Sequence, residues 1–196
     1  MENNILLSLS KDEKKLLEVK TMKKNKILFR EDDKCDSVSI VVSGEVKIST
    51  TSFEGKELIY NVLHKNDVFG NNLIFSDEPF YKGDVIATKD TTVVIIKREN
   101  LVSLLQSNKD FMISYLNAQS NFSKKLNSTI KLLSYSSAEE RFRFYLYTYN
   151  GKVQFKSVSE LASILHLQRE TLSRLLTKLE KENVIKRSLH QIDLLN

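Results

Sequence analysis

The chain of 196 residues has little of several features that mark whole classes of protein. Its single cysteine, Cys35, excludes a framework of internal disulfides and a four-cysteine cluster within one chain. No apolar run approaches the ~20 residues that a membrane-spanning helix needs. The N-terminus, MENNILLSLSKDEKK, lacks a basic region before a long apolar segment, so it does not resemble a secretory signal. We therefore expect a cytoplasmic protein with no membrane partner.

Glycine and histidine are also scarce, and neither is arranged as catalytic centres require. The chain has no glycine-rich phosphate loop and no Gly-x-Ser-x-Gly elbow. A catalytic metal in a small β-barrel needs His and carboxylate ligands at close spacing, whereas His64, His166 and His190 are scattered. A metal-dependent β-barrel enzyme stays open as an alternative. However, the sequence offers no catalytic residue and no metal site, and we expect no enzyme.

The residues that are present describe an ordinary globular protein with a basic balance. Hydrophobic residues make up 41% of the chain and charged residues 28%. The length suffices for two modest domains, each with its own core. The formal net charge of +5 suits a polyanionic partner such as nucleic acid, although a lysine-rich genome composition would produce the same excess.

The most informative stretch, residues 157–187, predicts two helices joined by a short turn at residues 166–168. Ser157 and Glu160 have the spacing of a capping box at the start of the first helix, and Arg169 opens the second. Both helices carry apolar residues at helical spacing, which buries the two stripes together. These residues are Val158, Leu161, Ala162 and Leu165 in the first helix and Leu172, Leu175, Leu176 and Leu179 in the second.

The polar face of the second helix has the chemistry of base recognition. Arginine donates two hydrogen bonds to the O6 and N7 of guanine, and glutamate accepts from the N4 amino group of cytosine. An ordinary amphipathic hairpin is the alternative interpretation. As base readers we expect Arg169, Glu170 and Arg174. The whole set of candidate DNA-binding residues is Arg169, Glu170, Ser173, Arg174, Lys156, Lys178, Lys186 and Arg187.

The string RETLSRLLTKLEKENVI resembles the recognition helix of the Crp/Fnr family of bacterial transcription regulators, and KRSLHQIDLLN resembles the wing, with Ile192 and Leu194 alternating. The resemblance implies a homodimer that binds double-stranded DNA at an inverted repeat, and RNA polymerase as a partner if the protein activates transcription. Two positions depart from the family pattern. His166 stands where relatives often have a turn glycine in the left-handed region, and Gln168 stands where a better N-cap such as Ser is usual.

Between Ile27 and Lys97 the apolar residues alternate with period two, which is typical of strands. Tight turns are expected at residues 43–45 and 53–56. We expect the strands flanking the first turn to form a hairpin, and the last two strands to pair with each other. The predicted strands are Val38–Val42, Val46–Ile48, Leu58–Val62, Val85–Ala87 and Thr92–Ile96. Short strands at this spacing indicate a β-sandwich or a double-stranded jelly roll rather than alternating βα units, and we expect a jelly roll in an α+β protein.

Three helices are predicted outside these regions, besides a short one near the N-terminus. A Ser-x-x-Glu box at residues 10–13 introduces the short helix, with Leu16, Leu17 and Val19 on it, and the basic run Lys20–Lys26 follows. The other helices are Arg98–Ser107, Asp110–Ser134 and Ala138–Tyr149; the last carries Phe142, Leu146 and Tyr149 on one face and ends at Asn150-Gly151.

The long helix carries an apolar stripe that one small domain cannot cover, and the resemblance implies that it pairs two chains. A monomer is the alternative. The dimerisation residues we expect are Tyr115, Phe122, Leu126 and Leu133, with Leu116, Ile130 and Leu132 beside them. The domains would then be a β-roll sensor at 1–108, the dimerisation helix at 109–134 and a winged helix-turn-helix at 135–196.

Strand order and the segment Val68-Phe69-Gly70 resemble the cyclic-nucleotide-binding-type β-roll of the same family. In relatives that bind cyclic nucleotides, a Phe-Gly-Glu-Leu segment and an Arg-Ser pair hold the ligand. Here Asn71-Asn72 replaces the glutamate region and Tyr81-Lys82 replaces the Arg-Ser pair, and a phenol with an ammonium does not replace a guanidinium fork.

We therefore expect an effector other than a cyclic nucleotide, with a cyclic-nucleotide regulator of atypical pocket as the alternative. The sequence does not identify a cofactor. It leaves open whether Cys35 is a sensor thiol or an inert buried residue, and whether Lys82 holds an anion or is simply exposed. The candidate effector-pocket residues are Gly70, Asn71, Asn72, Tyr81, Lys82 and Gly83.

Overall fold

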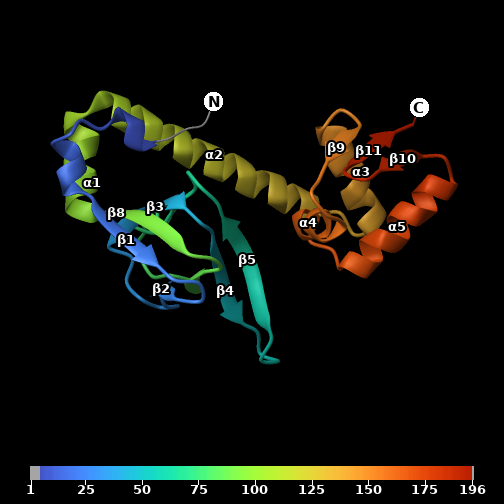
Figure 1. Cartoon of the computed structure of the whole chain (residues 1–196), viewed down its shortest axis with the longest axis horizontal. Helices are drawn as coiled ribbons and strands as arrows, with labels where there is room; N and C mark the ends of the chain where they lie inside the picture. Colours follow the sequence, from blue (N-terminus) through green and yellow to red (C-terminus); the bar gives the residue numbers. More distant parts are fainter. Residues whose placement is uncertain (1–4, 196) are drawn as a thin grey trace. The chain divides into compact units, whose positions relative to one another are not determined.

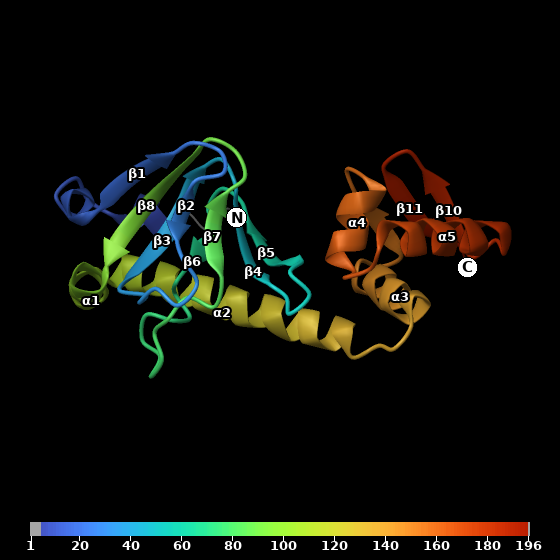
Figure 2. The same cartoon turned by 90° about the horizontal axis from the view of Figure 1, so that it is seen from below.

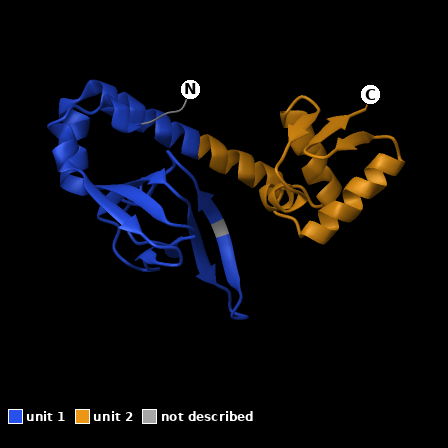
Figure 3. Cartoon of the chain, in the orientation of Figure 1, with its two compact units in different colours: residues 1–122 blue, residues 123–196 orange. Residues whose placement is uncertain are grey.

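The computed structural model describes residues 5–195, apart from the side chain of Tyr60. Figures 1 and 2 show its helices and strands from two directions. By internal contacts the chain divides into two compact units, the first ending at Phe122 and the second starting at Ser123 (Figure 3). This boundary falls inside the long helix α2 (Lys109–Leu133), so each unit contains part of that helix. None of the helices in residues 5–195 is long and apolar enough to cross a membrane.

The first unit contains two four-stranded antiparallel sheets (Figure 2), which confirms the predicted β-roll in an α+β protein. One sheet has the order β1 (Glu18–Met22), β8 (Thr91–Lys97), β3 (Ser37–Ser43) and β6 (Val68–Phe69). The other has the order β2 (Ile27–Phe29), β7 (Asp84–Ala87), β4 (Val46–Thr51) and β5 (Glu57–Leu63). Both sheets contribute to one apolar core, to which β3 and β8 supply runs of buried residues and β7 supplies alternate ones.

Two of the predicted strand pairings are wrong. β3 and β4 do not form a hairpin, because β3 pairs with β8 and β6 while β4 pairs with β5 and β7. β7 and β8 likewise belong to different sheets. The chain passes from one sheet to the other at Gly44, which has φ +87°. The predicted turn at residues 53–56 does join a hairpin, β4–β5, in which Gly55 has φ +77°.

The N-terminal prediction is only partly right. Ser10 and Glu13 exchange the two hydrogen bonds of a capping box, as predicted, but the helix they start is one 3-10 turn, Glu13–Leu16. Val19 lies in strand β1 with 66% of its surface exposed, and Lys20 lies in the same strand instead of in a separating run. These residues instead pair antiparallel with β8, which satisfies their backbone groups in the sheet.

The helices of the first unit agree closely with expectation: α1 spans Arg98–Ser107 and α2 begins at Lys109. Tyr115, however, is wrong as a dimerisation residue. It is 5% exposed and packs in the core of the first unit, with its hydroxyl accepting from Gln119. Leu132 is similarly buried, in the core of the second unit.

The second unit is a helical domain with a small sheet. Its helices are α3 (Ala138–Thr148), α4 (Val158–Ile164) and α5 (Arg169–Lys181), and its strands are β9 (Lys152–Gln154), β10 (Ile185–Ser188) and β11 (Gln191–Leu194). The predicted wing is the hairpin β10–β11, and β9, which was not predicted, extends it to the order β10-β11-β9. Ile192 is buried as the alternation suggested. Tyr149 and Leu194, expected on apolar faces, are 53% and 45% exposed.

Candidate nucleic-acid interface

Helix α5 has one buried side and one bare side, and the prediction for both is confirmed. Leu172, Leu175, Leu176 and Leu179 lie in the core of the second unit, because their spacing places them on a single stripe. The opposite side of the helix is exposed. We call this side the α5 polar face; its residues are Arg169, Glu170, Ser173, Arg174 and Thr177.

Thr177 was missed by sequence reasoning, although its spacing from Ser173 and Arg174 would have placed it on the same side. Its hydroxyl donates to the carbonyl oxygen of Ser173 at 3.0 Å. Arg174 makes one long contact, 3.4 Å from Nε to the carbonyl oxygen of Glu170. Among residues 5–195, Arg169 and the Glu170 carboxylate have no ion pair. The charged groups of this face are therefore available to an external partner.

The turn before α5 is held in the left-handed region by a residue other than glycine. His166 has φ +52°, as expected from its position, and the N–H groups of His166 and Leu167 donate to the carbonyl oxygens of Ser163 (3.1 Å) and Ala162 (2.9 Å). These two bonds form a Schellman motif that ends α4. Gln168 follows as the N-cap of α5 without a side-chain capping bond, which is the weak cap expected. Partial burial, and then the nearby Arg141 guanidinium, lower the pKa of His166.

The capping box predicted for α4 is only half formed. Ser157 accepts from the backbone N–H of Glu160 at 3.1 Å. The Glu160 carboxylate accepts from the N–H of Lys156, one residue before the N-cap, instead of from Ser157. The helix N-terminus is still satisfied by side chains, so α4 begins where the sequence predicted.

The basic candidates around α5 fall into two groups. Lys178 pairs with Glu139 at 3.0 Å, and Arg187 pairs with Glu180 at 3.2 Å. The hydrogen bond to Lys178 is the main cause that lowers the pKa of Glu139, and the same bond raises the pKa of Lys178. Lys156 and Lys186 are exposed and have no ion pair within the described residues. Exposed pairs of this kind contribute only about 0–1 kcal/mol, so phosphates can compete for Lys178 and Arg187.

The predicted effector-pocket residues differ in their surroundings. Tyr81 is 3% exposed and its ring stacks on Phe29 inside the β-roll, with ring centroids 4.6 Å apart. Lys82 is exposed, and its ammonium lies 3.8 Å from the Glu78 carboxylate. Asn72 is also exposed, whereas Gly83 is buried.

Gly70 and Asn71 are occupied by internal contacts. Gly70 has φ +77°, and a Cβ there would lie 2.7 Å from the carbonyl oxygen of Ser37. The Asn71 amide donates to Oε1 of Gln119 at 2.6 Å, and the Gln119 amide donates back to the Asn71 carbonyl oxygen at 2.8 Å. This segment therefore anchors the first part of α2, while the buried Oδ1 of Asn71 has no hydrogen-bond partner among residues 5–195.

Cys35 is buried between the same elements. Its thiol donates to the carbonyl oxygens of Ser37 (3.4 Å) and Gly70 (3.5 Å), and burial raises its pKa. Burial also raises the pKa of Tyr81. Both groups are consequently neutral near pH 7. Within residues 5–195, no three His, Cys, Asp or Glu side chains are grouped so that they could hold a metal ion.

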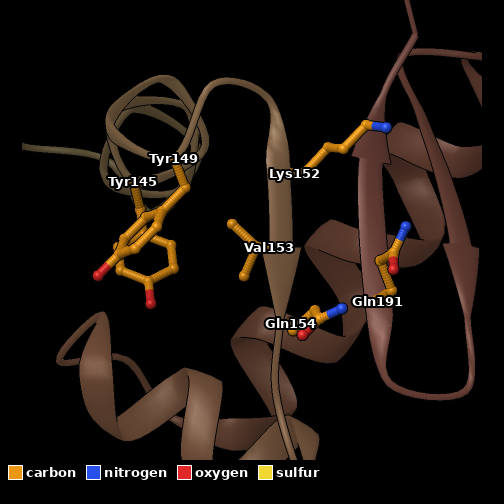
Figure 4. A pocket seen from close by; sticks show the side chains of 6 residues that line it. All are labelled: Tyr145, Tyr149, Lys152, Val153, Gln154 and Gln191. Carbon is orange, nitrogen blue, oxygen red and sulfur yellow. The ribbon is translucent and has the colours of Figure 1, made fainter.

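A pocket of about 370 Å³ lies in the second unit, where sequence reasoning expected none. Figure 4 shows the rings of Tyr145 and Tyr149 together on the α3 side and Val153 between them and the sheet. The centroids of the Tyr145 and Tyr149 rings are 4.8 Å apart. Burial is the largest of the causes that raise the pKa of Tyr145 to about 12. The remaining lining residues are Lys152, Gln154 and Gln191.

Comparison with known proteins matches the two units to two domain families. Residues 19–108 match the cyclic nucleotide-binding domain, and residues 141–196 match the Crp-like helix-turn-helix domain. The Anaerobic regulatory protein of Bacillus subtilis is 26% identical over 175 residues, 84% of this chain and 74% of that protein. The Cyclic AMP receptor protein of Thermus thermophilus is 25% identical over 168 residues, 82% of this chain and 76% of that protein.

The fold is shared with solved structures of the same kind. A CooA variant from Carboxydothermus hydrogenoformans superposes with a TM-score of 0.72 at 20% identity, covering 97% of this chain and 90% of that one. The two domain matches together span most of the chain, in the order that the sequence predicted. Such proteins are DNA-binding regulators rather than enzymes, and the chain belongs to the Crp/Fnr family of transcription regulators.

Proposed function

We propose that this regulator binds an inverted-repeat operator as a homodimer and reads its sequence with the α5 polar face. The observation that carries the proposal is the separation of α5 into a buried leucine stripe and a bare side bearing two arginines and a glutamate. A helix of this kind fits the major groove, whose width matches that of a helix.

Each polar side chain has its own role in the proposal. Arg169 and Arg174 donate to guanine and Glu170 accepts from cytosine, with Ser173 beside them. A carboxylate near phosphates is repelled unless it accepts from a base, so Glu170 acts only in specific complexes. Phosphate contacts come from cations around the helix. These cations are the exposed Lys156, Lys178 and Lys186 and the partly exposed Arg187.

The proposed dimer uses the exposed apolar side chains of α2. Leu116, Leu126, Ile130 and Leu133 are between 45% and 59% exposed, which is costly for a helix that meets only water. Two heptad series contain these residues, each interrupted by one polar residue, Ser123 or Gln119. The series are Leu116, Ser123 and Ile130, and Gln119, Leu126 and Leu133. Phe122, also expected at the interface, is half-buried.

In this proposal residues 1–108 are the sensor domain, 109–134 the dimerisation helix and 135–196 the DNA-binding domain. Two protomers paired along α2 carry two recognition helices to successive half-sites. If the protein activates transcription, RNA polymerase is a further partner. Such a regulator works where the chromosome is, in the cytoplasm.

Selection of bound duplexes from a random pool tests the proposal. We expect the selected sequences to be inverted repeats whose half-sites contain G·C pairs and whose centres lie about one DNA turn, roughly 34–36 Å, apart. Mass measurement in solution should give two chains per complex. A single unrepeated half-site, or a monomer that stays monomeric on DNA at micromolar concentration, would contradict it.

We further propose that the effector is not a cyclic nucleotide. Tyr81 replaces the guanidinium expected at this position, and its ring fills part of the β-roll interior against Phe29. Asn71 has no carboxylate for a ribose hydroxyl, and its amide is already bonded to Gln119. A charged hydrogen bond is worth about 1.5–3 kcal/mol, so two missing groups remove most of the affinity.

Calorimetry with cyclic AMP and cyclic GMP should therefore give no saturable heat at micromolar concentrations. The matched variant is Lys82→Ala, which removes the remaining cation at the position of the missing guanidinium. Saturable micromolar binding of either nucleotide that disappears in Lys82→Ala would establish the alternative, a cyclic-nucleotide regulator with an atypical pocket.

A further inference from the structure

One guanidinium in the second unit binds two backbone carbonyls that are distant in the sequence. Arg141, in the first turn of α3, donates from Nε to the carbonyl oxygen of Tyr135 at 3.0 Å and from Nη1 to that of His166 at 3.2 Å. Tyr135 lies between the end of α2 and the N-cap of α3, and His166 lies in the turn before α5. The planar fork of arginine holds two acceptors in fixed directions, which a lysine ammonium cannot do.

The turn at His166 needs an external support. Its left-handed backbone is strained for a residue with a Cβ, and the Gln168 side chain makes no capping bond to α5. The two Schellman bonds hold only the side of the turn that faces α4. The carbonyl oxygen of His166, two residues before the N-cap of α5, accepts a hydrogen bond from the Arg141 guanidinium of α3.

The Tyr135 end is fastened to α3 as well. The Tyr135 ring packs on the Phe144 ring with centroids 5.1 Å apart. The Lys131 ammonium lies 5.0 Å from the centroid of the Phe144 ring. The backbone N–H of Tyr135 makes only a long bond, 3.3 Å, to the carbonyl oxygen of Leu132. Arg141 therefore supplies a short polar contact to a segment otherwise held by ring packing.

From this geometry we infer that Arg141 is a positioning residue for DNA recognition. It sets the turn that directs α5, and it ties that turn to the segment leaving α2, so that the two segments are held by the same side chain. The inference rests on the proposed function, because it assigns Arg141 to the reading of the operator without any contact to DNA.

The DNA test compares Arg141→Met with Arg143→Met. Both changes remove one guanidinium from α3, but Arg143 pairs only with Glu139, at 2.9 Å on the surface of that helix. We expect Arg141→Met to lose on the order of tenfold affinity for the selected duplex, the size of one mismatched base pair, beyond the loss in Arg143→Met. Affinity for a scrambled duplex should be the same in both variants. The inference would be overturned if Arg141→Met lost affinity for the selected duplex and for the scrambled duplex equally.

Amide hydrogen exchange of the full chain, without DNA, tests the link itself. In Arg141→Met, exchange should quicken in residues 134–138 and in residues 165–169 together, while Arg143→Met leaves both unchanged. Arg141→Lys, which keeps the charge and can satisfy one carbonyl at a time, should show a partial effect and serves if Arg141→Met does not fold. Faster exchange in only one of the two segments, or equally throughout the second unit, would overturn the link. Failure of operator selection alone would overturn the proposed function and leave this result standing.

Discussion

Arg174→Ala should weaken binding to the selected operator by about 1–3 kcal/mol per half-site, or about 2–6 kcal/mol for a dimer using both half-sites. The guanidinium lies on the exposed side of α5 and makes only a 3.4 Å contact to the Glu170 carbonyl oxygen, so it can turn to a base edge at little cost. Its loss leaves a guanine without two donors. Fluorescence titration of labelled duplexes at constant salt measures the loss, and base preference should relax at one pair per half-site.

Lys186→Ala is the matched control for this prediction. Lys186 is exposed in β10, and its replacement by alanine removes one positive charge, as Arg174→Ala does, but no proposed base contact. Its loss should weaken all duplexes alike and reduce the salt slope by about one unit per removed phosphate contact. If Arg174→Ala also weakens operator and scrambled duplex equally, Arg174 contacts phosphate and the proposed docking of α5 is wrong.

Gly44→Ala should destabilise the first unit by about 4 kcal/mol or more, an effect that few single changes reach. Gly44 has φ +87°, and a Cβ there would press against the Thr91 hydroxyl, 2.5 Å from the Asp90 carbonyl oxygen and 2.6 Å from the Thr91 Cα. Two of these three neighbours are backbone atoms and cannot move aside. This is the point where the chain crosses between the sheets, so relief would require the crossing itself to shift.

Gly55→Ala separates strain from crowding. Gly55 has a similar φ, +77°, but nothing lies within 4 Å of a Cβ built there. Its replacement should cost only the left-handed strain of an alanine, roughly 1–2 kcal/mol. Urea unfolding followed by far-ultraviolet circular dichroism compares the variants through the transition of the first unit. Similar losses in both variants would mean that the contacts around Gly44 are not the cause.

Local features of the fold could be predicted from the sequence because neighbouring residues determine them. The span of α1, the leucine stripe of α5, the left-handed turn at His166 and the β4–β5 hairpin all follow from periodicity or turn chemistry. The polar face of α5 was predictable for the same reason, since burial of one stripe exposes the opposite one. The residues exposed on α5, which we propose as base readers, were therefore determined by the sequence itself.

Pairing between distant segments was decided by the tertiary structure. A tight turn such as the one at Gly44 has the same local pattern whether its strands join one sheet or two, so β3 and β4 were assigned to a hairpin that the roll does not contain. The period of α2 placed Tyr115 on a stripe but could not show that the core of the first unit covers it. Arg141 was equally invisible, because its acceptors are backbone carbonyls, which every residue has, and only the folded chain brings two of them to one guanidinium.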